Sequence, residues 1–141
     1  MNLEESLNLI QNCAAQMNQL YGQTVFDEWA VVSLTAREGK VLGYIGPRKE
    51  DFQKNFPEDL GTLRSEIGAE HHGLGDFAFA RHGFGTHFEG FLVLGDQVYL
   101  ICNNTTRSMS DIAQDSRWLK AQVPFVELSD RFRGDPLVSR F

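Results

Sequence analysis

The residues of this chain best suited to bind a metal ion are four histidines and two nearby glutamates, Glu70, His71, His72, His82, His87 and Glu89. Zinc sites need three or four ligands whose spacing lets them converge on one point. The run Glu70-His71-His72 lacks the HExxH spacing, and adjacent side chains on a helix point in different directions. We therefore expect no metal site, and interpret the histidines as solvated loop and strand-end residues that could tune a surface with pH.

The segment HGFGTHFEG, residues 82–90, is rich in glycine, as are loops that bind phosphate. Phosphate-binding loops open a helix and usually carry a lysine with a serine or threonine. Here a strand is expected to follow, and no lysine is near. A hairpin connection with a bulge explains these glycines better than a nucleotide site does.

Cys102 and Ser108 are the candidate nucleophiles. Cys102 lies within YLICNN, an apolar strand in which a thiolate is disfavoured. Ser108, with Asp111 three residues later, has the form of a helix capping box, which explains the serine. The sequence has no GxSxG motif and no recognisable acid–base pair. It therefore predicts a protein that is not an enzyme, with no catalytic residue and no cofactor.

Length, charge and cysteine content indicate the number of domains, the kind of partner and the location of the protein. The 141 residues are the size of one domain, and the net charge of −6 argues against nucleic acid or an anionic membrane as the main partner. No apolar run is long enough to span a membrane, and the acidic, amphipathic N-terminus is unlike a signal peptide. The only cysteines, Cys13 and Cys102, fit reduced core thiols, so we expect a cytoplasmic protein.

The stretch Phe88–Asn104 is expected to form the centre of the fold. Its apolar runs Phe91–Leu94 and Val98–Cys102 flank Gly95-Asp96-Gln97, where Gly and Asp accept the positive φ of a tight hairpin turn. Both runs are apolar on both faces, and such strands must be covered on both faces. We therefore expect helices on each side of a sheet, with this hairpin near its middle.

Periodicity predicts the elements that precede this hairpin. A narrow apolar stripe, with Asn2 as N-cap and Gly22 as C-terminal stop, predicts a helix over Leu3–Tyr21. The segments Trp29–Thr35 and Lys40–Ile45 are rich in residues typical of strands and are separated by a turn.

Glycine and proline mark expected irregularities. Gly43 inside the second strand indicates a bulge or a close helix approach. Pro57 is expected to break or kink the helical region Arg48–Ile67, so that it has two pieces. Pro124 is expected to start a new helix or to kink the last one.

With Phe77–Arg81 as the third strand, the element order is α-β-β-α-β-β-β-α. This order predicts an α/β (α+β) fold, a single three-layer α/β/α sandwich over residues 1–141 with a five-stranded, mainly antiparallel sheet.

A group of phenylalanines surrounds the middle helical region and the strands after it: Phe52, Phe56, Phe77, Phe79, Phe84, Phe88 and Phe91. The group is either core or, in part, a surface patch that a second subunit or a partner buries. The hairpins also leave an edge strand that could pair with its copy in a second chain.

The amphipathic first helix, the hairpin WAVVSLTAREGKVLGYI and the strands from FAFAR through HFEGFLVLGDQVYLICNN resemble the roadblock / dynein light-chain family. That family is a relative of the longin and profilin-like α/β/α sandwiches. The resemblance implies a non-enzymatic homodimer whose partner is a Ras-like small GTPase or another signalling protein. It also implies a dimer surface on Arg48–Ile67 and the neighbouring second or third strand. The apolar side chains of that helical region are Phe52, Phe56, Leu60, Leu63 and Ile67.

Two alternatives remain open at this point. One is a small-molecule sensor of PAS or GAF type, in which Phe79, His82 and His87 line a ligand pocket between the sheet and the middle helices. The other is a hydrolase or metalloenzyme, which requires the histidines to converge.

Overall fold

A five-stranded antiparallel sheet forms the middle layer of the protein, with strand order β2-β1-β5-β4-β3. The computed structural model describes residues 1–35, 39–71, 77–82, 87–105 and 112–138. The strands are β1 (Glu28–Ser33), β2 (Lys40–Ile45), β3 (Phe77–His82), β4 (His87–Gly95) and β5 (Val98–Asn103). The helices are α1 (Leu3–Tyr21), α2 (Lys49–His71), α3 (Arg117–Ala121) and α4 (Val123–Gly134), with a 3₁₀ turn at Ile112–Gln114.

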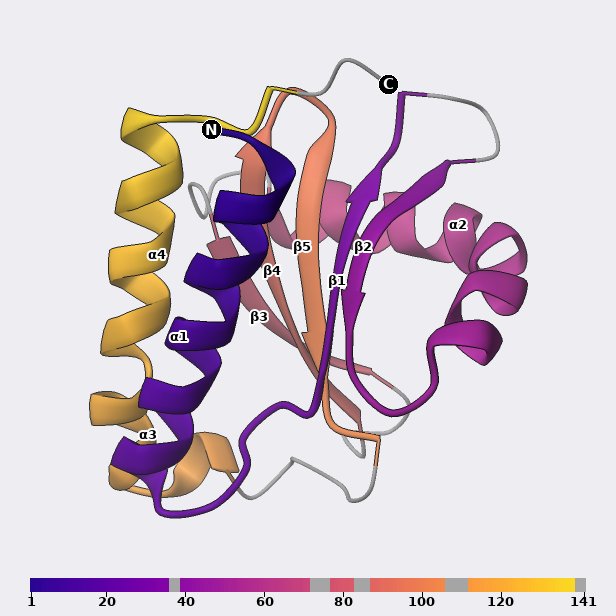
Figure 1. Ribbon diagram of the computed structural model, residues 1–141. Coiled ribbons are helices and arrows are strands. Elements are labelled where there is room, and N and C mark those ends of the chain that lie inside the picture. The colour runs from indigo at the N-terminus through magenta and orange to yellow at the C-terminus, as the bar shows by residue number, and fades with distance from the viewer. Residues whose placement is uncertain (36–38, 72–76, 83–86, 106–111, 139–141) are drawn as a thin grey trace.

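The helices cover both faces of the sheet. Figure 1 shows α1, α3 and α4 on one face and α2 on the other. Two apolar clusters fill the spaces between these layers, one beneath α1 and α4 and one beneath α2. The prediction of an α+β fold with helices around an antiparallel sheet is confirmed. The predicted element order is not matched at its end, where a 3₁₀ turn and two helices, α3 and α4, stand in place of one helix.

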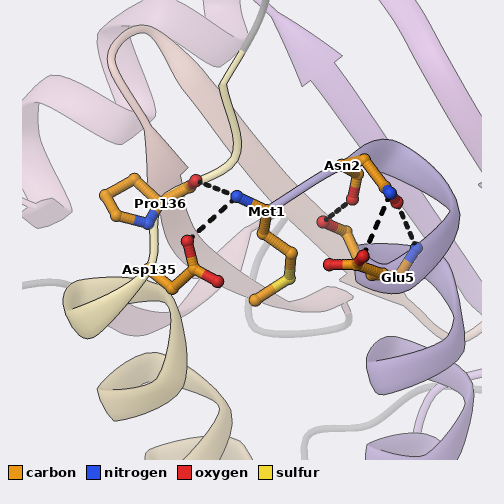
Figure 2. A network of polar contacts seen from close by, with 6 residues as sticks. Met1, Asn2, Glu5, Asp135 and Pro136 are labelled. Atoms are coloured by element: carbon orange, nitrogen blue, oxygen red, sulfur yellow. Dashed lines mark hydrogen bonds and ion pairs between the residues drawn. The ribbon is translucent and has the colours of Figure 1, made fainter.

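Local signals fix both ends of α1. The side chain of Asn2 accepts a hydrogen bond from the backbone N–H of Glu5 at 2.8 Å. Gly22 has φ of +86° and its N–H donates to the carbonyl of Asn18 at 2.8 Å. Figure 2 shows the cap beside a second set of contacts, in which the amino nitrogen of Met1 donates to Asp135 Oδ1. The start of α1 is thereby tied to the segment that follows α4.

The turn between β4 and β5 differs from the prediction. Gln97, with φ of 58°, adopts the positive φ, and neither Gly95 nor Asp96 does. Gly95 is required for another reason: a Cβ there would clash with the backbone carbonyl oxygen of Leu137. The segment after α4 crosses this point, where the N–H of Leu137 donates to the carbonyl of Leu94 at 2.7 Å.

The two prolines act differently. Pro124 lies in the first turn of α4, so the prediction that it starts a new helix is confirmed. Pro57 lies inside α2, which continues through it as one helix, so of the two expected effects of this proline, a break or a kink, the break is wrong. A proline in a helix removes one hydrogen bond, and the burial of Phe56 and Leu60 against the sheet offsets that loss. Figure 1 shows α2 curving across its face of the sheet.

Several predictions concern residues outside the described part of the chain. They are the turn residues at 36–38 and 73–76, the glycines at 83 and 85 with Phe84, and the capping box of Ser108 and Asp111.

Replacing Gly90 with alanine should destabilise the fold by about 1–3 kcal/mol, because the new methyl group overpacks the core. A Cβ at Gly90 would lie 2.6 Å from Cys102 Sγ and 3.2 Å from the ring of Phe79. Urea unfolding of both proteins would measure this. The control is Gly61→Ala in α2, where a Cβ meets nothing within 4 Å. That variant should be as stable as the parent or slightly more stable, and equal loss in both variants would contradict the overpacking argument.

Candidate functional site

A buried carboxylate lies at the first residue of β1. The side chain of Glu28 is 1% exposed, and both of its oxygens accept hydrogen bonds. The hydroxyl of Tyr44 donates to Oε1 at 2.5 Å, and Arg48 Nη2 donates to Oε2 at 2.9 Å. A buried charge requires pairing of this kind, because an unpaired one is strongly disfavoured.

The connection from β2 to α2 brings these three groups together. Tyr44, near the end of β2, lies opposite Ala30 of β1 and therefore diagonal to Glu28 on the same face of the sheet. Arg48 directly precedes α2. The backbone N–H of Arg48 donates to the same Tyr44 hydroxyl at 3.2 Å. Gly46, with φ of +158°, lies in the connection, and a Cβ there would lie 2.8 Å from that hydroxyl. The cluster therefore joins β1, β2 and the start of α2.

The contacts with Glu28 determine the protonation states of Tyr44 and Arg48. Burial, followed by the hydrogen bond to Glu28, raises the pKa of Tyr44 to about 12. The hydrogen bond to Glu28 raises the pKa of Arg48 above its usual value. Tyr44 is therefore a protonated donor and Arg48 a cation at neutral pH, and the arrangement is that of a structural clamp.

Removing the hydroxyl of Tyr44 should weaken this clamp. We expect Tyr44→Phe to lower the free energy of unfolding by about 1.5 kcal/mol, the magnitude typical of a partly buried hydrogen bond to a charged group. The folded-state pKa of Tyr44, about 12, exceeds the ordinary value of 10.0. This contribution is therefore present at neutral pH and disappears as the pH rises through about 12.

Tyr21→Phe is the matched control for Tyr44→Phe. The hydroxyl of Tyr21 lies 3.5 Å from Asp115 Oδ2, too far for a strong hydrogen bond. Thermal and urea unfolding should show little change in this control, and an equal loss in both variants would argue against the clamp.

A row of polar residues continues from this clamp across the sheet. Glu28 pairs with Asn103 of β5, and Asn103 pairs with Glu89 of β4. Cross-strand partners share a face of the sheet, so these three lie on the face covered by α2. Asn103 is 6% exposed, and its Oδ1 has no hydrogen-bond partner in the described structure. The row places polar side chains beside the apolar cluster that fills this layer.

The predicted interface residues belong to α2, and the structure describes the side chains of three of them. Phe56 and Leu60 are 5% and 4% exposed and pack against Ala30, Val32 and Ile101 of the same chain. Phe52 is half-buried and stacks on Phe56, with ring centroids 5.9 Å apart. These side chains are core residues, and a second subunit is not needed to explain them. The side chains of Leu63 and Ile67 lie outside the described part of the structure.

Phe79, one of the predicted pocket residues, packs among aromatic rings of the same chain. Its ring contacts those of Trp118 and Phe125, each with a centroid distance of 4.8 Å. Aromatic side chains of the protein itself therefore occupy the space on this side of Phe79. His82 and His87 pair across β3 and β4, but their side chains lie outside the described part of the structure.

The two cysteines are buried in the cluster beneath α1. Burial raises the pKa of Cys13 to about 12 and raises that of Cys102 well above its usual value. Both thiols are therefore protonated at neutral pH, as expected of core residues. Within the described ranges, no group of three or more His, Cys, Asp or Glu residues could hold a metal ion. Among the same residues, no helix is both long and apolar enough to cross a membrane.

Sequence reasoning missed the clamp because its members carry no shared spacing. Glu28, Tyr44 and Arg48 each fit an ordinary position, at a strand start, in a strand and before a helix. The one available signal was an acidic residue directly before an apolar strand. In comparisons with known proteins, no family model matches this chain and no curated protein matches it significantly.

Proposed function

We propose that this chain is a non-enzymatic binding module that forms a homodimer through the edge strand β3. In this proposal the dimer binds a signalling protein, with a Ras-like small GTPase as the first partner to test. The choice of a GTPase as partner is based on the resemblance to roadblock-like proteins. The choice of β3 as the dimer-forming strand is based on a difference between the two edges of the sheet.

The two edge strands differ in regularity. On one side, the register of β2 against β1 shifts between Val31 and Val32, and a Cβ at Gly43 would lie 3.0 Å from Leu7 of α1. Bulges of this kind discourage a further strand from pairing. On the other side, β3 pairs with β4 over Phe77–His82 without a register shift. The regularity of β3 is the observation that carries the proposal, since a straight edge offers N–H and C=O groups to another strand.

Symmetry restricts how two copies could pair. A two-fold axis perpendicular to the sheet keeps the α1 face of one copy on the same side as that of the other. Because residues directly opposite one another share a face, Phe79 would then lie opposite an odd-numbered residue of β3, such as Phe79 itself. This pairing extends the sheet across both copies and leaves α2 of each copy on one common face.

Hydrogen–deuterium exchange across a concentration series tests the dimer without any mutation. We expect the mass from sedimentation to double with concentration, and the amides of β3 to become protected over the same range. The matched internal control is β2, the other edge, whose amides should keep the same exchange rate. A monomer throughout the series, or protection of β2 in place of β3, would contradict the proposal.

The partner is tested separately, with the purified dimer and small GTPases loaded with GTP or with GDP. Preferential binding of one nucleotide state is expected of a regulator. Failure to bind any GTPase would remove that partner class and leave the dimer unaffected.

A further inference from the structure

We draw no further inference here: the strongest candidate, the groove between α1 and α4 lined by Leu9, Cys13, Pro124, Leu128 and Arg131, is an unpartnered surface, and nothing in the structure shows what covers it.

Discussion

Phe125→Ala should lower the free energy of unfolding by about 3–5 kcal/mol, the usual cost of truncating a fully buried phenylalanine. Phe125 of α4 is 0% exposed. Its ring lies 4.8 Å from that of Phe79, 5.9 Å from that of Phe77 and 6.4 Å from that of Trp29, measured between centroids. One side chain thus joins the helical layer to β1 and β3, and its removal leaves a cavity at their meeting point. Chemical denaturation monitored by tryptophan fluorescence would measure the loss.

Val126→Ala is the matched control for Phe125→Ala, because it shortens the neighbouring side chain of the same helix. Val126 is 38% exposed, so its truncation should change stability by no more than about 0.5 kcal/mol. If the two variants unfold at the same urea concentration, Phe125 does not stabilise the packing of α4 onto the sheet.

The second large effect is expected from Arg48→Met, which removes the cation from the buried carboxylate of Glu28. Breaking a buried ion pair usually costs 3–5 kcal/mol, and we expect about 2–3 kcal/mol here. The lower figure reflects the 43% exposure of Arg48, since water already screens this pair in part. Arg133→Met is the control, because both side chains of the Arg133–Asp130 pair are 61% exposed and contribute little.

The double variant Arg48→Met/Glu28→Gln separates a lost charge from lost packing. Arg48→Met alone leaves the buried carboxylate of Glu28 without its cation, and Glu28→Gln removes that charge. The double variant should therefore regain part of the stability that Arg48→Met loses at pH 7. A double variant no more stable than Arg48→Met would show that the methylene stem of Arg48, and not its charge, is what matters.

The parts of the fold that the sequence predicts well are those with local causes. The first helix has its N-cap, its stripe and its glycine stop within one continuous segment, and α1 spans the predicted Leu3–Tyr21. Gly43 indicated a bulge or a close helix approach, and both occur: the β1–β2 register shifts beside it, and Leu7 packs over it. In each case, the type of one or a few neighbouring residues in the sequence is enough to predict the feature.

The features that could not be predicted depend on contacts between distant segments. Pro57 is unfavourable in a helix by local rules, yet α2 continues through it because its neighbours pack against strands from both halves of the chain. The apolar spacing of Phe56 and Leu60 is the same for a core face and for a subunit interface, so periodicity could not choose between them. Glu28 likewise shows its role only when β2 and α2 are placed beside it.

The strand order has a consequence for the sequence of events in folding. The hairpin β1–β2 and the meander β3–β4–β5 each join neighbours in the chain, but the middle of the sheet is the pairing of β1 with β5. During synthesis, β1 is complete long before β5 leaves the ribosome. Until then, the edge of β1 that pairs with β5 in the folded protein has no strand beside it. The side chains of β1, which are apolar on both faces, also lack the part of the helical layer that α4 completes. Joining the two halves is therefore a late, non-local step, and the nascent N-terminal half is the part of this protein with most need of a chaperone.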